Sequence, residues 1–180
     1  LGCGTDLRPG WINVDIRGDV GADVVWDITS GLPFANNRAE TVAAQDVLEH
    51  LTTQQQQRVL AEIWRVLRRE GKLSVRLPNI DAIISRFAAD AETRNLFLYG
   101  DTSHSGAWGA HKSGHTLKSF ATLARMVGLR LVRSDEVDSN YVFEFSKSNP
   151  INRPGQIGFI NQSLGLGGAE TFNQGLLQWW

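Results

Sequence analysis

The start of the chain combines two glycines with three well-spaced carboxylates. Gly2 and Gly4 follow the apolar Leu1, and glycine lets a loop backbone approach a ligand closely because it has no Cβ atom. Three acidic residues each end a stretch with the pattern of a short strand: Asp15, Asp27 and Asp46. The carboxyl ends of parallel strands lie along one edge of a sheet, where nucleotides bind. This order predicts a nucleoside-like cofactor at that edge, with Asp15 toward the ribose hydroxyls.

A dinucleotide is the alternative ligand for a glycine loop of this kind. Its fingerprint needs a third glycine three positions after Gly4, where Leu7 stands, and an acid about 20 residues downstream. Asp15 follows Gly4 by only 11 positions, so any helix between them is short or replaced by a loop. A pyrophosphate favours a full helix N-terminus. The sequence therefore favours a smaller cofactor than a dinucleotide.

The rest of the pattern alternates strands with helices, as a doubly wound parallel sheet requires. Thr53 and Gln56 predict a capping box for a helix with an apolar stripe, and Gly71 is expected to end that helix. A turn at 138–140 is short enough for an antiparallel pair. The later elements are predicted as a strand at 72–77, a helix at 80–91, a helix from 116 to the stop at Gly128, and strands at 129–132 and 141–145.

These residues resemble the class I S-adenosylmethionine (SAM)-dependent methyltransferases, in the branch whose first motif reads LGCG, a few residues and then PGWxNVD. Further motifs follow in order: Asp27-Ile28 with GLPF at 31–34, VLEHL at 47–51 and RVLRREGKL at 65–73. The resemblance covers residues 1–148. It implies an α/β fold with a Rossmann-like doubly wound sheet, a truncated first strand and a terminal antiparallel hairpin. Two departures are the missing strand before Leu1 and Glu70-Gly71 in place of the usual Gly-Gly.

The resemblance also implies a cofactor site. In the family, the glycine loop faces the methionine part of SAM, the acid after the second strand holds the ribose, and the acid after the third strand lies near the adenine. Carried to this sequence, the cofactor-binding residues are Gly2, Cys3, Gly4, Asp15, Ile16, Asp27, Ile28 and Asp46.

The segment from Tyr99 to His115 holds three of the four histidines and follows the strand after which methyl acceptors usually approach. Methyl transfer from a sulfonium is an in-line displacement, for which positioning can supply ~7–11 kcal/mol. A hydroxyl acceptor also needs its proton removed. We prefer His111 as the base because imidazole is partly neutral near pH 7, with His115 and Tyr99 as further catalytic candidates. A glycine- and serine-rich lid with solvated histidines is the equally weighted alternative.

A metal site is another use of these residue types. Asp46, Glu49 and His50 have the spacing of a helical site with two oxygen ligands and one nitrogen, resembling metal-dependent members among small-RNA and quinone methyltransferases. Most family members carry Leu-Glu-His without a metal, so we assign no metal from the sequence and keep this set as the alternative. One further histidine group fits no standard zinc spacing: His104, His111 and His115.

Composition excludes several classes of protein. A length of 180 residues with 42% hydrophobic content suits one domain with a sizeable core. The net charge of -1 provides no basic patch for nucleic acid. Cys3 is the single cysteine, which excludes an internal disulfide. Apolar runs all fall short of the ~18 residues of a membrane span, so we expect a cytoplasmic location without stable membrane insertion.

The last 30 residues begin a different pattern. Proline and glycine punctuate 149–155, and a strand at 156–160 leads to a glycine loop that ends in Gly168-Ala169-Glu170. This stretch resembles the start of a retaining glycosyltransferase with two Rossmann domains, whose first strand runs into GGAE. We therefore expect a methyltransferase domain at 1–148, a linker at 149–155 and a truncated glycosyltransferase domain at 156–180, in a chain cut at both ends.

Together these patterns predict an enzyme that transfers a methyl group from SAM to a hydroxyl of a sugar or glycan precursor. The expected partners are a small-molecule or saccharide acceptor and the downstream glycosyltransferase domain, with no nucleic acid. Two alternatives stay open. If residues 156–180 define the protein, nucleotide-sugar transfer is its main activity. If no residue acts as a base, the domain is a non-catalytic cofactor-binding module.

Overall fold

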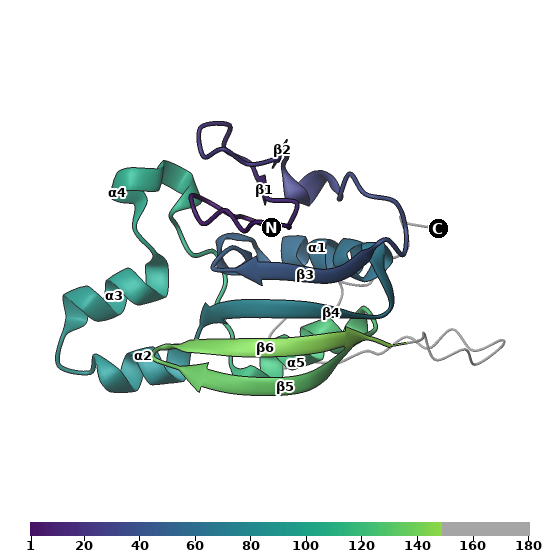
Figure 1. Ribbon diagram of the computed structural model, residues 1–180. Helices are drawn as coiled ribbons and strands as arrows, with labels where there is room; N and C mark the ends of the chain where they lie inside the picture. The colour runs from purple at the N-terminus through teal and green to yellow at the C-terminus, as the bar shows by residue number, and fades with distance from the viewer. Residues whose placement is uncertain (149–180) are drawn as a thin grey trace. The chain divides into compact units, whose positions relative to one another are not determined.

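The computed structural model describes residues 1–148, apart from the side chains of His104 and Ser105. The predicted linker at 149–155 and the predicted glycosyltransferase start at 156–180 lie outside the described residues. Residues 1–148 belong to one compact unit, and in the middle of the chain strands alternate with helical segments as predicted (Figure 1).

The larger sheet has four strands in the order β3-β4-β6-β5. β3 (Ala39–Gln45) runs parallel to β4 (Leu67–Pro78), whereas β6 (Asn140–Lys147) is antiparallel to both β4 and β5 (Leu129–Val137). The predicted terminal hairpin is therefore confirmed. Its strands are longer than predicted because Arg133 to Val137, a largely polar stretch, continues to pair with β6.

A second, two-stranded parallel sheet consists of β1 (Val14–Asp15) and β2 (Val24–Val25). The first residues of the chain lie between the two sheets. The amide of Cys3 donates to the carbonyl of Val14 at 3.1 Å, and the terminal amine of Leu1 donates to the carbonyl of Ala43 in β3 at 2.6 Å. The start of the chain therefore brings the end of β1 close to β3.

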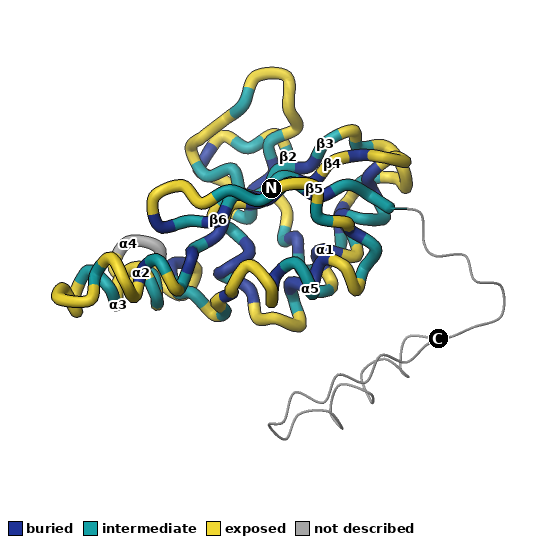
Figure 2. The backbone as a smooth tube through the Cα atoms, turned by 90° about the horizontal axis from the view of Figure 1, so that it is seen from below, coloured by how far each residue is buried: buried dark blue, intermediate teal, exposed yellow. Residues whose placement is uncertain are grey.

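Two amphipathic helices, α1 (Thr53–Val66) and α5 (Leu117–Met126), cover the same face of the larger sheet. Side chains alternate between the two faces of a strand, so every second strand residue faces these helices. Figure 2 shows the buried segments gathered at this layer. The large buried side chains of the helix–sheet layer include Leu60, Ile63, Leu73, Val75, Phe120, Phe143 and Phe145. Burial of each contributes roughly 1.5–3 kcal/mol.

The start and end of α1 differ from the prediction. The capping box joins Thr52 to Gln55, one residue earlier than predicted, and the helix ends at Val66 rather than at Gly71. The carbonyl of Val66 accepts a hydrogen bond from the amide of Arg38, which leads into β3. A tertiary contact, rather than a glycine cap, therefore satisfies the end of the helix, and Gly71 lies within β4.

The predicted helix at 80–91 is shorter than expected and is followed by further helices. They are α2 (Ile80–Arg86), α3 (Ala91–Tyr99), α4 (Thr102–Ser105) and a 3₁₀ turn, η3 (Gly106–Trp108). Asp90 and Asp101 cap α3 and α4 through their side chains. Figure 1 shows α2, α3 and α4 beyond the end of the sheet to which β3 and β4 point. Across residues 1–148, none of the helices is long and apolar enough to cross a membrane.

Candidate active site

The glycine loop lies directly against Val47, the second residue after β3. Gly2 has a φ of +61°, and a Cβ atom at this position would lie 2.5 Å from Cγ2 of Val47. A contact this short cannot be accommodated without movement of the backbone or of Val47. Gly2 is thus required both by its backbone conformation and by its neighbour.

Asp15 connects the glycine loop to the end of β1. Its buried carboxylate accepts hydrogen bonds from two backbone amides, those of Gly4 at 2.8 Å (to Oδ2) and of Arg17 at 2.9 Å (to Oδ1). A carboxylate offers about four lone-pair positions, so each oxygen can still accept one more bond. Asp15 therefore shapes the loop and retains the capacity to bind a hydroxyl. Ile16, between Asp15 and Arg17, is half-buried.

Replacement of Asp15 by alanine should lower the affinity for S-adenosylhomocysteine by roughly 1–3 kcal/mol, because a charged acceptor is lost and the Gly4 amide is left without its partner. Isothermal titration calorimetry measures this change. Asp19→Ala, at an exposed acid of the same segment, is the matched control and should bind normally. Equal affinity in the Asp15 variant and the control would contradict the assignment.

Asp27 and Ile28 begin a 3₁₀ turn, η1 (Ile28–Ser30), just after β2. Asp27 Oδ1 accepts hydrogen bonds from the amide and the hydroxyl of Thr29 at 2.8 and 2.7 Å. The side chain of Ile28 is buried in the core. Asp27 therefore orients the turn, and Ile28 has only its backbone available to a ligand. The amide of Trp26 donates to the Asp15 carbonyl at 2.7 Å, which holds this turn near the end of β1.

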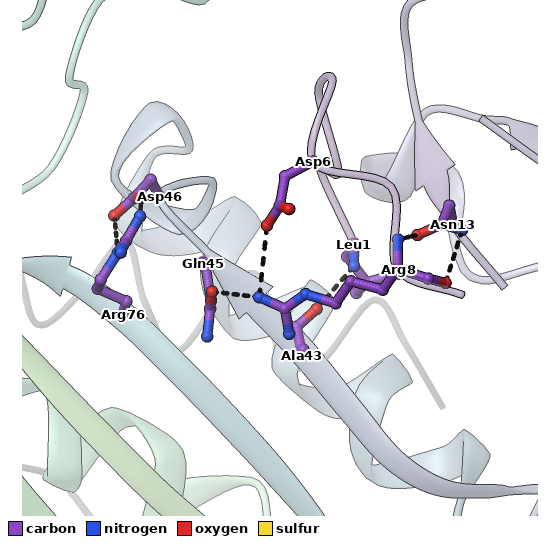
Figure 3. Close-up of polar contacts among 8 residues, drawn as sticks. All are labelled: Leu1, Asp6, Arg8, Asn13, Ala43, Gln45, Asp46 and Arg76. Carbon is purple, nitrogen blue, oxygen red and sulfur yellow. Dashed lines mark hydrogen bonds and ion pairs between the residues drawn. The ribbon is translucent and has the colours of Figure 1, made fainter. Parts of the chain in front are cut away.

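Asp46 directly follows β3 and is engaged with the neighbouring strand. Its carboxylate accepts two hydrogen bonds from the guanidinium of Arg76 in β4, one of them 2.8 Å from Nε (Figure 3). The same contacts raise the pKa of Arg76 further above its ordinary value. This pairing places Asp46 with Arg76 rather than with a metal.

A hollow of about 280 Å³ lies between the glycine loop and the end of β3. Its polar lining comes partly from residues that the sequence did not single out. Arg8 reaches across to Gln45, with its Nη2 2.5 Å from Oε1, and also forms an ion pair with Asp6 at 3.6 Å (Figure 3). Gly2, Cys3 and Asp46 also line the hollow. Of the predicted cofactor-binding residues, the hollow brings together only these three, and Gly4, Asp15, Ile16, Asp27 and Ile28 are not part of its lining. Arg8, Gln45 and Arg76 are added to them.

Glu49 is the most unusual carboxylate of the described residues. It lies in a 3₁₀ turn, η2 (Leu48–His50), is only 4% exposed, and its Oε2 has no hydrogen-bond partner within residues 1–148. Burial raises the pKa of Glu49 to about 8, with a smaller contribution from Asp46. A carboxylic acid in this setting holds a proton at neutral pH or needs a cation beside it.

His111 lies beside Glu49 and His50 because the backbone after η3 is bonded to η2. The amide of Lys112 donates to the Glu49 carbonyl at 2.8 Å, and the rings of His50 and His111 have centroids 5.1 Å apart. Burial, together with the nearby His50, lowers the pKa of His111. Glu49, His50 and His111 each offer one potential ligand atom, and these three atoms lie within 4.8 Å of one another. We call these three residues the Glu-His-His cluster.

The other two catalytic candidates have different positions. His115 is buried, with Nε2 2.7 Å from Oε1 of Gln56 and Nδ1 3.2 Å from Oγ of Ser119. It therefore links α1 to the start of α5. Tyr99 is 66% exposed, and its backbone carbonyl accepts a hydrogen bond from the His111 amide at 2.9 Å. Of the three candidates, the structure brings only His111 into the Glu-His-His cluster.

Comparisons with known proteins show which family model and which folds this chain resembles. Residues 2–75 match the family model described as a methyltransferase domain, and no curated protein matches this chain. A structure of the PH0226 protein from Pyrococcus horikoshii aligns with a TM-score of 0.60 and 16% identity, over 82% of this chain and 79% of the other. A SAM-dependent methyltransferase from Thermotoga maritima aligns with a TM-score of 0.59 and 13% identity, over 82% and 80%.

A chain from the complex of the Haloferax volcanii Trm112 methyltransferase activator with a methyltransferase is also similar, with a TM-score of 0.60 and 11% identity over 82% of this chain and 80% of the other. At these identities the similarity is one of fold, and it confirms the predicted Rossmann-like α/β architecture. The family match covers the chain from the glycine loop into β4, and the shared fold is one that a SAM-dependent methyltransferase adopts.

Proposed function

We propose that this enzyme transfers the methyl group of SAM to a hydroxyl group of a saccharide. The observation that carries the proposal is the Glu-His-His cluster. Its Glu49 follows the carboxyl end of β3 and lies two residues after Val47, the residue against which Gly2 packs. This places acid–base groups close to the loop that is expected to hold the sulfonium. Methyl transfer needs the acceptor atom in line with the methyl group, so the acceptor and cofactor sites have to adjoin.

The cofactor is proposed to lie along the carboxyl edge of β1, β2 and β3. Gly2, Cys3 and Gly4 would face its methionine part, Asp15 its ribose, and Asp27 with Ile28 its adenine. The free lone pairs of the Asp15 carboxylate and the backbone of the η1 turn support these roles. Asp46 would contribute through its position beside the hollow, with its carboxylate held by Arg76.

The acceptor is proposed to be a hydroxyl because the site offers a neutral imidazole. A hydroxyl is a poor nucleophile at neutral pH unless its proton is removed or its pKa is lowered. The lowered pKa of His111 keeps its ring neutral at pH 7, so it can accept a proton or bind a cation. Positioned proton transfer contributes ~10²–10⁴-fold to a rate.

The saccharide is suggested by the sequence pattern at 156–180, which resembles the start of a glycosyltransferase. A sugar-transferring domain in the same chain would place both activities on one pathway, in the cytoplasm and without nucleic acid or stable membrane insertion. The same pattern favours a second candidate, in which nucleotide-sugar transfer is the main activity and 1–148 serves as a cofactor-binding module.

The test is a methyl-transfer assay with isotope-labelled SAM and a panel of sugars, nucleotide sugars and oligosaccharides, with mass spectrometry of the products. We expect S-adenosylhomocysteine and a singly methylated saccharide in equal amounts. His111→Ala should lower turnover by ~10²-fold or more while cofactor affinity stays within a few fold, since this group acts in the transition state. Binding of SAM with methylation of a non-saccharide acceptor would overturn the substrate class, and failure to bind SAM would overturn the function.

A further inference from the structure

We propose that Glu49, His50 and His111 bind a divalent transition-metal cation. The first support is the buried Glu49 carboxylate, whose Oε2 has no hydrogen-bond partner among the described residues. A buried carboxylate oxygen without a partner is costly. A cation between Glu49 and the two imidazoles would supply that partner.

The second support is the separation of the donor atoms. One donor atom from each residue lies within 4.8 Å of the others. Two ligands of one ion, each about 2.0–2.2 Å from it, are at most about 4.4 Å apart. Side-chain rotations that move these atoms by about an ångström would therefore complete the set.

The third support is the orientation of His50. Its Nδ1 lies 3.1 Å from the carbonyl oxygen of Ala110, and because a carbonyl can only accept, Nδ1 carries the proton. Nε2 of the neutral ring is then left with a free lone pair. A ring N–H donated to a backbone carbonyl is the usual support of a metal-binding histidine.

The donor set indicates which cation fits. Two imidazoles and one carboxylate suit Zn²⁺, Co²⁺, Mn²⁺ or Fe²⁺, whereas Mg²⁺ and Ca²⁺ prefer sites made of oxygen atoms. Three protein ligands leave a coordination position open, as in catalytic rather than structural sites. Asp46, the oxygen ligand that the sequence spacing suggests, lies instead in its ion pair with Arg76.

This inference rests on the proposed function in one respect only, the identity of the group that occupies the open coordination position of the cation. In that position an acceptor hydroxyl would bind the cation, which lowers the pKa of the hydroxyl. As the new O–CH₃ bond forms and the S–CH₃ bond breaks, the hydroxyl proton passes to water. His111 then acts as a ligand and not as the base, and the cation performs the activation.

The experiment uses the tag-free 180-residue chain after treatment with a chelator. Co²⁺ is added during calorimetry and during visible spectroscopy, which reports the d–d bands of the coordinated ion. We expect one equivalent of Co²⁺ to bind, and Glu49→Gln and His111→Ala each to weaken binding by at least about 10-fold, the smallest effect that even outer-shell changes produce. Asp46→Asn is the matched control. Because the Asp46 carboxylate pairs with Arg76, this variant should bind Co²⁺ within about 3-fold of the unmodified chain. Circular dichroism checks that each variant is folded.

Absence of Co²⁺ binding, or binding that neither Glu49→Gln nor His111→Ala weakens, would overturn the cation site. Loss of binding in Asp46→Asn together with normal binding in His111→Ala would overturn it in favour of the set Asp46, Glu49 and His50. Binding of Co²⁺ as expected, with no methylated saccharide in the transfer assay, would leave the cation site standing and reject the proposed acceptor. The two proposals can therefore fail separately.

Discussion

Replacement of Gly2 by alanine is expected to weaken S-adenosylhomocysteine binding by at least about 2 kcal/mol, or about 30-fold. An L-residue at the left-handed φ of +61° costs roughly 1–2 kcal/mol. The new Cβ atom would also lie 2.5 and 2.7 Å from Cγ2 and Cβ of Val47. Val47 has little freedom to withdraw because its side chain is β-branched and stiff, and because Asp46 before it is tied to Arg76. Overpacking of this kind costs about 1–3 kcal/mol, so the loop itself should be displaced.

Gly10→Ala is the control that separates the two causes. Gly10 also has a positive φ, +80°, but a Cβ atom there would meet nothing within 4 Å. The control therefore carries the backbone strain without the contact. We expect its cofactor affinity to stay within a few fold of the unmodified chain when both are measured by calorimetry. If the Gly2 and Gly10 variants behave alike, the close packing of the glycine loop on Val47 is not what shapes the cofactor site.

The grouping of the glycine loop with Asp15 was predictable because its signals are local in sequence. A glycine in a left-handed turn and an acid at the end of a strand can each be recognised within a few residues. Their order along the chain then places them together through the rule that parallel strands end at one edge. The helix at 117–126 was predictable for the same reason, since Thr116 caps its start and Gly128 follows its end.

The errors occur where a distant contact decides the structure. Gly71 has the residue type of a helix stop, but α1 ends five residues earlier because the segment before β3 bonds to its last carbonyls. The predicted helix at 80–91 is longer than the observed α2, which ends at Arg86, although Asp90 carries the pattern of a cap for the next helix. The end of α1 depends on residues far from it in the sequence. The end of α2 depends on a choice between two local signals.

The cluster beside the cofactor edge shows the same division. The Leu-Glu-His motif marked Glu49 and His50, and residue type marked His111, but no spacing rule connects positions so far apart. The backbone bond from Lys112 to Glu49 makes the connection. Asp46, which spacing would group with Glu49 and His50, is instead drawn to the opposite charge of Arg76 on the adjacent strand.

The metal-free protein is expected to lose stability as the pH rises from about 4.5 to about 8, and Glu49→Gln should remove most of that loss. Burial raises the pKa of Glu49 from 4.5 to about 8 in the folded chain. Between these values the folded protein holds a proton that the unfolded chain has released, so the free energy of unfolding falls as the pH rises. At about 1.36 kcal/mol for each pKa unit, the upper bound on the loss is roughly 5 kcal/mol.

Urea unfolding at a series of pH values, with a chelator present, measures this dependence. The Glu49→Gln variant cannot ionise at this position and should be more stable than the unmodified chain at pH 8 by several kcal/mol, within that upper bound. At pH 4.5 the two should be similar, because Glu49 is protonated in the folded state there. Glu136→Gln, at an exposed glutamate, is the control and should follow the unmodified chain at every pH. A pH profile for Glu49→Gln that matches the control would show that the carboxylate ionises freely in the folded protein.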